Sequence, residues 1–160
     1  MVTAKQILDN SIKFHRDSKD VEFDSIEPAR YDLAQKKLSF KGHAVGQSKK
    51  LYKVEVAFYN VDPDGLTPDQ LAAGMVPKPK DLLDHPVKVD CECYDYMWNG
   101  ALRGNLKHGC ALYTHKDFTT YEKKTDAAPK NPDEVPYGCK HIVSFIYDIM
   151  AALEDTNKGE

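Results

Sequence analysis

Two neighbouring segments of the chain alternate between apolar and polar residues with a period of two. Residues 38–44 and 52–58 both follow this pattern, which is typical of strands with one buried and one solvated face. The stretch Gly-Gln-Ser-Lys at 46–49 has turn composition, so it predicts an antiparallel hairpin. Val87, Val89 and Cys91 alternate with polar residues and predict a further strand over residues 87–91.

The first segment of the chain has helical rather than strand periodicity. Over residues 3–16 the apolar side chains return to one face, which predicts an amphipathic helix lying on the sheet. Thr3 followed by Gln6 matches a capping box at its first turn.

The clearest helical stripe follows Gly138. Its apolar residues recur at spacings of three, four, seven, eight and eleven positions, namely Ile142, Phe145, Ile146, Ile149, Met150 and Leu153. Such spacing predicts a long helix with its stripe in the core. The polar residues from Glu154 onward are expected to fray.

Two shorter helices complete the predicted elements. Thr67-Pro68 predicts a helix start, because proline suits the first helical position. Asp95 is expected to cap a helix over residues 96–106. Residues 110–136 form a long polar stretch, and a loop of that length is often functional or ordered by a partner.

These elements predict an α+β fold. An antiparallel sheet would carry an N-terminal helix and a metal-stapled C-terminal half that ends in a long amphipathic helix. The length of 160 residues suits one domain spanning 1–160. Within it we expect a helix-plus-hairpin part at 1–86, a metal-stapled part at 87–153 and a frayed tail at 154–160.

Composition and charge narrow the function classes. The chain is 41% hydrophobic and carries a net charge of -3, so a general nucleic-acid binder is not expected. No apolar run approaches the ~20 residues that span a bilayer. The N-terminus lacks the apolar stretch of a signal peptide, so we expect synthesis in a reducing cytoplasm.

Two short clips carry the candidate chemistry. Cys91-Glu92-Cys93 and Cys139-Lys140-His141 each place two metal ligands one residue apart. Three thiolates and one imidazole form a complete tetrahedral set for zinc, and a closed set leaves no position for substrate. In a reducing compartment this spacing favours metal over disulfides. We therefore predict a structural zinc held by Cys91, Cys93, Cys139 and His141.

Cys110 leaves other interpretations open. It is a possible additional ligand, and with the other three cysteines it would supply four thiolates for an iron–sulfur cluster. The thiols could also all be reduced and metal-free. The paired clips favour zinc because they account for four ligands without Cys110.

Recognised catalytic motifs are missing from the sequence. The chain contains no glycine-rich phosphate loop, no Gly-x-Ser-x-Gly and no His-Glu-x-x-His, so we expect a protein that is not an enzyme. A nucleic-acid-binding zinc module is the alternative, with a basic surface formed by Lys107, His108, Lys123, Lys124 and Lys130. Several nearby carboxylates oppose that alternative.

The order Cys-x-Cys followed by Cys-x-His resembles the SWIM-type zinc finger, in which the first pair sits on a β-hairpin and the second starts a helix. A wider stretch, residues 87–150, resembles a group of small structural proteins of tailed bacteriophages. The likeness lies in Cys-Glu-Cys-Tyr-Asp-Tyr-Met-Trp at 91–98, Asn-Pro at 131–132 and Gly-Cys-Lys-His-Ile at 138–142.

The second resemblance implies a structural component of the virion head, neck, tail or baseplate. Such a protein would be made in the host cytoplasm and then incorporated into the particle. Its partners would be other virion proteins in a multimeric assembly, without a membrane and without a role for nucleic acid.

Overall fold

A computed structural model describes most of the chain, covering residues 1–11, 21–46, 49–93, 95–113, 131 and 133–158. Within these ranges the side chains of residues 98–99, 102–103 and 155–158 are not described. The second half of the predicted helix 3–16 and most of the polar stretch 110–136 therefore lie outside the described residues.

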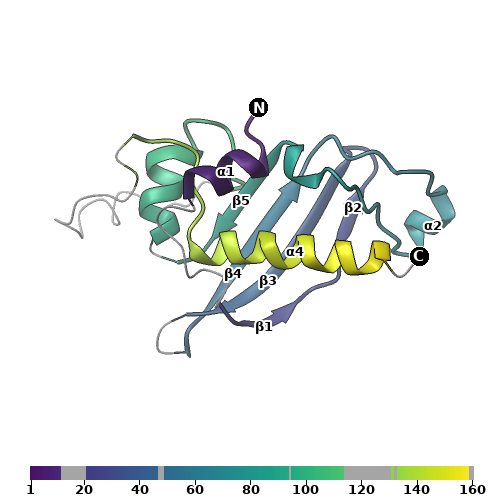
Figure 1. Ribbon diagram of the computed structural model, residues 1–160, viewed down its shortest axis with the longest axis horizontal. Helices are drawn as coiled ribbons and strands as arrows, with labels where there is room; N and C mark the ends of the chain where they lie inside the picture. Colours follow the sequence, from purple (N-terminus) through teal and green to yellow (C-terminus); the bar gives the residue numbers. More distant parts are fainter. Residues whose placement is uncertain (12–20, 47–48, 94, 114–130, 132, 159–160) are drawn as a thin grey trace.

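One antiparallel sheet organises the described chain (Figure 1). Its strand order is β1-β3-β4-β5, and β2 also pairs with β3. The strands are β1 (Phe23–Ile26), β2 (Arg30–Asp32), β3 (Lys37–Val45), β4 (Leu51–Phe58) and β5 (Val87–Cys91). With a helix at each end of the chain, this arrangement confirms the predicted α+β fold.

The predicted hairpin is formed by β3 and β4. Their register runs from Leu38 opposite Phe58 to Val45 opposite Leu51. Strand β3 alternates strictly between buried and partly exposed residues, as its sequence predicts. Strand β5 joins the other edge of β4 with Val54 opposite Cys91, so the division we placed at residue 86 falls inside one continuous sheet.

Strands β1 and β2 were not predicted. Both pair with β3 along its outer edge, β1 beside residues 42–44 and β2 beside residues 37–39. Three of the four residues of β1 are exposed, so this strand lacks the apolar alternation that marks a strand in a sequence. Phe23 packs against the ring of Phe145, with centroids 5.1 Å apart.

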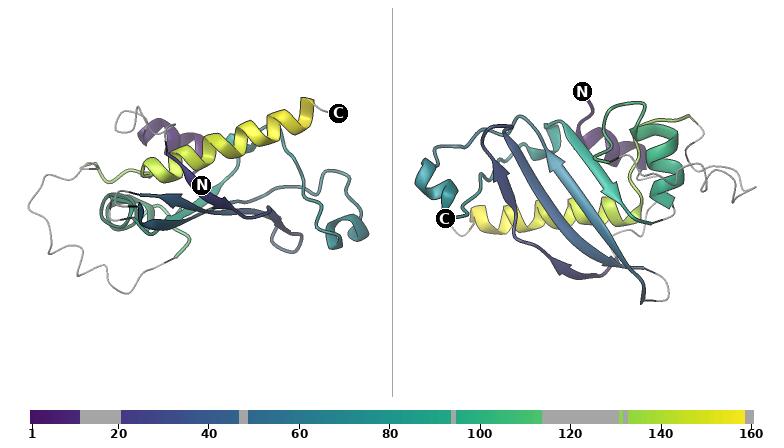
Figure 2. Two further views of the ribbon diagram at one scale, coloured as in Figure 1. Left: turned by 90° about the horizontal axis from the view of Figure 1, so that it is seen from below. Right: turned by 180° about the vertical axis from the view of Figure 1, so that it is seen from behind.

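Helices α1 (Ala4–Ser11) and α4 (Lys140–Lys158) cover one face of the sheet (Figures 1 and 2). The predicted capping box of α1 is present. The Thr3 hydroxyl accepts the Gln6 amide hydrogen at 3.2 Å, and the Gln6 carboxamide accepts that of Thr3 at 2.9 Å. The buried face of α1 consists of Ala4, Ile7, Leu8 and Ser11, as its spacing predicts.

Helix α4 supplies the centre of the core. Its buried apolar residues are Ile142, Val143, Phe145, Ile146 and Ile149. The helix continues through Lys158, so the tail predicted to fray from Glu154 begins within α4. Residues 154–158 contain neither glycine nor proline, and Gly159 is the first helix-breaking residue. Among the described residues, no helix is both long and apolar enough to cross a membrane.

The connection from β4 to β5 makes an excursion that holds two short helices, α2 (Pro68–Ala72) and η3 (Leu82–Asp84). The predicted start of α2 is confirmed, since Thr67 and Gln70 form a second capping box and Pro68 takes the first helical position. Helix α2 buries none of its residues, so it is a surface element.

The predicted helix over 96–106 is present as η4 (Tyr96–Asn105), but it is wound as a π-helix rather than an α-helix. In a π-helix each backbone N–H donates to the carbonyl five residues earlier. The Leu106 N–H accordingly donates to the Ala101 carbonyl at 3.2 Å. The prediction of Asp95 as its cap is wrong. The Asp95 carboxylate makes no capping bond and instead accepts the hydroxyl hydrogen of Tyr137 at 2.9 Å.

Gly104 permits a close packing contact on η4. A Cβ at this position would lie 2.1 Å from the carbonyl oxygen of Val135, a distance that non-bonded atoms do not adopt. The missing side chain therefore lets the segment before α4 lie directly against η4.

Gly104→Ala is expected to lower the free energy of unfolding by about 1–3 kcal/mol, because the added methyl must displace backbone. Urea denaturation followed by circular dichroism measures the change. Leu106→Ala, two residues further along at the surface, serves as the control and should cost less than about 1 kcal/mol. An alanine variant at 104 as stable as the control would contradict this packing.

Candidate metal centre

Three elements bring the four predicted ligands together. Cys91 is the last residue of β5, and Cys93 follows two residues later at the approach to η4. Cys139 immediately precedes α4, and His141 lies in its first turn. These four residues, which we call the metal centre, are all buried. Residues almost 50 positions apart in the chain therefore meet where β5 ends and α4 begins.

The metal centre has dimensions suited to one ion. The three Sγ atoms and a ring nitrogen of His141 all lie within 4.8 Å of one another. The Nδ1 atom of His141 is 3.8 Å from Sγ of both Cys91 and Cys139. A tetrahedron with Zn–S bonds of about 2.3 Å and a Zn–N bond of about 2.0 Å has edges of roughly 3.5–3.8 Å. The side chains therefore need only small movements to coordinate a metal.

The three thiols differ in acidity. Burial raises the pKa of Cys91 and of Cys139 well above the ordinary thiol value. Hydrogen bonds from Cys139 and Cys91 hold the pKa of Cys93 well below that value. Cys93 is therefore the most acidic of the three thiols. A divalent ion would supply the positive charge that allows all three sulfurs to be deprotonated.

Backbone groups also favour negative charge at Cys93. The amide N–H of Tyr96 donates to its Sγ at 3.4 Å, from the first turn of η4. Cys139 occupies the corresponding position before α4, where the amide hydrogens of a helix N-terminus favour an anion. Both clips thus place a sulfur at the start of a helix.

The ring of His141 is oriented by its surroundings. Nδ1 faces the sulfurs, and the ring packs on Tyr52 with centroids 5.4 Å apart. Nε2 is buried and has no hydrogen-bond partner among the described residues. If a metal binds Nδ1, Nε2 carries the proton, and the aromatic contact with Tyr52 holds the ring in place.

A buried amide that the sequence analysis missed ties η4 to the second clip. The Asn105 side chain accepts the Tyr137 amide hydrogen at 2.7 Å and donates to the Tyr137 carbonyl at 2.7 Å. It also donates to the Tyr96 hydroxyl at 3.3 Å, and that hydroxyl donates to the Val89 carbonyl at 2.9 Å. Asn105 therefore holds both the backbone N–H and the carbonyl of Tyr137, which lies two positions before Cys139.

Helix α1 supplies a further support. The Ser11 hydroxyl accepts the amide hydrogen of Gly138 at 2.8 Å and donates to the carbonyl of Ile7 at 2.6 Å. Asn10 donates its amide hydrogen to the Pro136 carbonyl at 3.0 Å. The chain entering the second clip is thus held by the N-terminal helix as well as by η4.

Cys110, predicted as a possible additional ligand, is not part of the group of four described residues that could hold one ion. Its carbonyl accepts the amide hydrogen of Val89, which places it beside the middle of β5 rather than at the end. Cys110 is fully buried, and burial raises its pKa to about 12, so it is a protonated core thiol.

The basic surface proposed for a nucleic-acid-binding loop is only partly described. Lys107 Nζ pairs with the Glu134 carboxylate at 2.5 Å, and the His108 ring contacts the Glu134 carbonyl at 2.9 Å. Lys123, Lys124 and Lys130 lie outside the described residues. The two described members of that group thus engage the protein itself.

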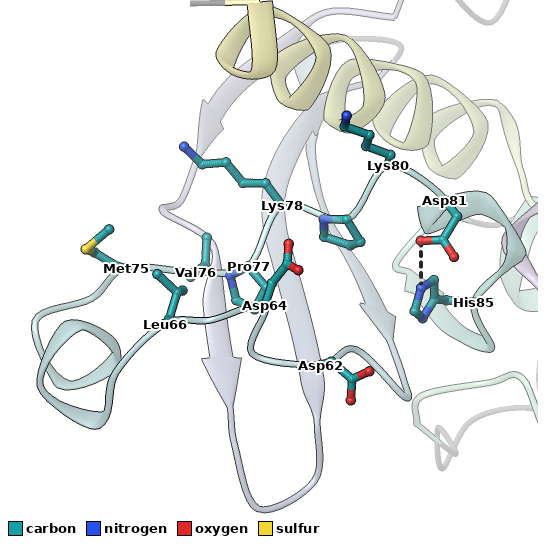
Figure 3. Close-up of a pocket in the computed structure, with 11 residues that line it drawn as sticks. Asp62, Asp64, Leu66, Met75, Val76, Pro77, Lys78, Lys80, Asp81 and His85 are labelled. Atoms are coloured by element: carbon teal, nitrogen blue, oxygen red, sulfur yellow. Dashed lines mark hydrogen bonds and ion pairs between the residues drawn. The ribbon is translucent and has the colours of Figure 1, made fainter. Parts of the chain in front are cut away.

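A separate pocket of about 590 Å³ lies along the excursion between β4 and β5 (Figure 3). It contains His85, whose Nε2 is 3.2 Å from the Asp81 carboxylate and whose Nδ1 is 3.0 Å from the Tyr59 carbonyl. Both ring nitrogens are therefore engaged, and the lining residues include no serine, threonine or cysteine. Among the described lining residues, no hydroxyl or thiol nucleophile is paired with a histidine base.

No protein-family model, curated protein or solved structure matches this chain. The resemblance to SWIM modules therefore rests on the four ligands and their order. The resemblance to bacteriophage proteins rests on the sequence of residues 87–150.

Asn105→Ala is expected to lower the free energy of unfolding by about 2–4 kcal/mol, because it leaves buried groups of Tyr137 without partners. Urea denaturation at constant zinc concentration measures the loss. Asn10→Ala is the matched control, since it removes one half-buried bond and should cost about 1 kcal/mol. Equal losses in the two variants would show that the Asn105 network does not stabilise this region.

Proposed function

We propose that the metal centre holds one structural zinc ion and that the protein is a non-catalytic structural component. The observation that carries this proposal is the convergence of three buried sulfurs and one imidazole nitrogen within 4.8 Å. Cys₃His is an established ligand set of structural zinc sites. Without a metal, no comparable interaction would favour bringing three buried thiols to one point.

Zinc is favoured over an iron–sulfur cluster by the donor set. Clusters are held most often by four cysteines, and the fourth cysteine here lies beside the middle of β5. The nearest fourth donor is instead the imidazole of His141. Mixed sulfur and nitrogen ligation at tetrahedral spacing suits zinc, which accepts both donors without a geometric preference of its own.

The zinc would act as a staple. It would join Cys93 to Cys139 across 45 intervening residues, which include η4 and the proline-containing stretch before α4. Closing that segment costs conformational entropy, and the zinc would add to the burial of Tyr96, Ala101 and Tyr137 in offsetting that cost. Metal binding would contribute folding free energy directly at the start of α4.

A non-catalytic role is supported by the closed ligand set, because four protein ligands leave no coordination position for water or substrate. In the pocket of Figure 3, both ring nitrogens of His85 already have hydrogen-bond partners, which also supports a non-catalytic role. Catalysis elsewhere would require groups outside these two sites.

The setting we propose is the virion of a tailed bacteriophage, in assembly with other virion subunits. Its support is the sequence resemblance over residues 87–150, together with a surface rich in loops and short helices such as α2. Mass spectrometry of purified particles of the phage that encodes the chain tests this setting. Detection at stoichiometric copy number is expected, and absence from intact particles would rule it out.

Metal analysis of the purified protein tests the proposed zinc. We expect about one zinc per chain and a colourless solution, because Zn²⁺ is d¹⁰. Iron with acid-labile sulfide and visible absorbance would support the cluster instead. A metal-free, fully folded protein would refute both.

Cys139→Ser is expected to abolish stoichiometric zinc binding and to lower the free energy of unfolding by several kcal/mol, about the loss typical of a structural metal. A strong chelator should destabilise the wild-type protein comparably and leave the variant unchanged. Cys110→Ser is the control and should retain zinc, although it alters a buried thiol. Zinc loss in the control, or unchanged melting of Cys139→Ser, would contradict the assigned ligands.

A further inference from the structure

The metal centre is not equally enclosed on every side. Cys91 and Cys139 are 0% exposed, whereas Cys93 and His141 are each 4% exposed. An external molecule that approaches an ion bound there therefore meets the centre from the side of Cys93 and His141. Access from this side decides how readily the ion exchanges with the surroundings, because the other two ligands are sealed in the core.

A pocket of about 580 Å³ lies next to the metal centre, and its lining includes Tyr52, Glu92 and Met97. Glu92 separates Cys91 from Cys93 in the chain, and the Met97 amide donates to the Cys93 carbonyl at 3.1 Å. The volume is within the range of pockets that admit small molecules. A small molecule in this pocket would therefore be a close neighbour of the Cys93 ligand.

The charged groups of this pocket balance one another. Its described lining includes two lysines and two carboxylates, namely Lys50, Lys53, Asp90 and Glu92. With equal numbers of each sign, these groups carry no formal net charge that would attract or repel an ion or a chelator. Any control that the pocket exerts over the metal centre is therefore steric, and it depends on which side chain stands in the way.

Tyr52 is the side chain that connects the pocket with the histidine ligand. It lines the pocket, and its ring packs on the imidazole of His141 with centroids 5.4 Å apart. Lys50 Nζ lies 5.5 Å from the centroid of the same ring. A Cβ at Gly46 would lie 2.2 Å from Cε2 of Tyr52, so the glycine leaves the space that the ring occupies. Neighbours on both sides of the β3–β4 turn thus hold the ring against His141.

We propose that the Tyr52 ring is a lid on the metal centre that slows the exchange of its zinc with external chelating ligands, an inference that rests on the proposed zinc. Zinc can expand from four to five ligands, so exchange begins when an external donor reaches the ion before a protein ligand leaves. A donor that arrives from the pocket meets the Tyr52 ring first. As Zn²⁺ passes to the chelator, the released thiolates take up protons from water and no electron is transferred.

Zinc transfer from the zinc-loaded full-length protein to the chromogenic chelator pyridylazoresorcinol tests the lid. The transfer rate is measured against chelator concentration, so that the slope reports attack by the chelator and the intercept reports spontaneous opening. Tyr52→Ala should raise the slope at least about threefold, because it removes an aromatic contact that holds the lid closed. Gly46→Ala should also raise the slope, because its methyl displaces the ring while the backbone there is outside the left-handed region.

Two control variants separate the lid from general loosening of the fold. Leu51→Ala truncates the exposed neighbour of Tyr52 and should change the slope and the intercept by less than about twofold. Val61→Ala leaves a cavity beyond the other end of β4, so it should raise the intercept rather than the slope. Circular dichroism verifies that each zinc-loaded variant is folded. If Tyr52→Ala does not fold, Tyr52→Leu replaces it, with a smaller rise in the slope expected.

Three results would overturn the proposal. The first is a wild-type slope in both the Tyr52 and the Gly46 variants when they carry zinc, which would remove the lid and leave the structural zinc in place. The second is an equal rise of the slope in either control, which would show that general loosening governs access. The third is a wild-type protein that binds no zinc, which would overturn the proposed zinc and the lid together.

Discussion

The meeting of β5 and α4 at the metal centre is the constraint on which the C-terminal half depends. Cys91 is fixed by its ladder with Val54, so the position of the centre is set by the middle of the sheet. Cys139 and His141 lie where α4 begins, so a metal bound there would fix the start of the helix. Because the apolar stripe of α4 starts directly afterward, at Ile142, one anchoring point determines which residues reach the core. The position of the metal centre and the packing of the hydrophobic core therefore depend on each other.

Ligands alone do not determine this geometry, since the approach to the second clip is held by two polar supports. Asn105 fixes the peptide unit of Tyr137 from η4, and Ser11 fixes Gly138 from α1. Such contacts around a metal site hold the ligands in position before the ion binds, which lowers the entropy lost on binding. The glycine at 104 belongs to the same arrangement, because it lets the incoming segment lie against η4.

The sequence predicts those features that a local pattern encodes. The β3–β4 hairpin, both capping boxes and the stripe of α4 follow from alternation, side-chain chemistry and period. Strand β1 has mostly exposed side chains and β2 spans only three residues, so no apolar alternation marks either strand. The four candidate ligands could be picked out from the sequence, and the structure brings them together, because cysteine and histidine side chains are chemically specific. The position of Cys110 depends on a bridge to Val89, and the role of Asn105 depends on tertiary contacts, so neither could be inferred from spacing.

The face of the sheet that α1 and α4 cover carries both the hydrophobic core and the metal centre. The central claim concerns this metal centre. X-ray absorption spectroscopy at the zinc edge of the purified protein tests it most directly. We predict three sulfur ligands at about 2.3 Å and one nitrogen ligand at about 2.0 Å. Coordination by oxygen and nitrogen alone, or a spectrum unchanged by Cys139→Ser, would contradict the assignment of Cys91, Cys93, Cys139 and His141 as ligands.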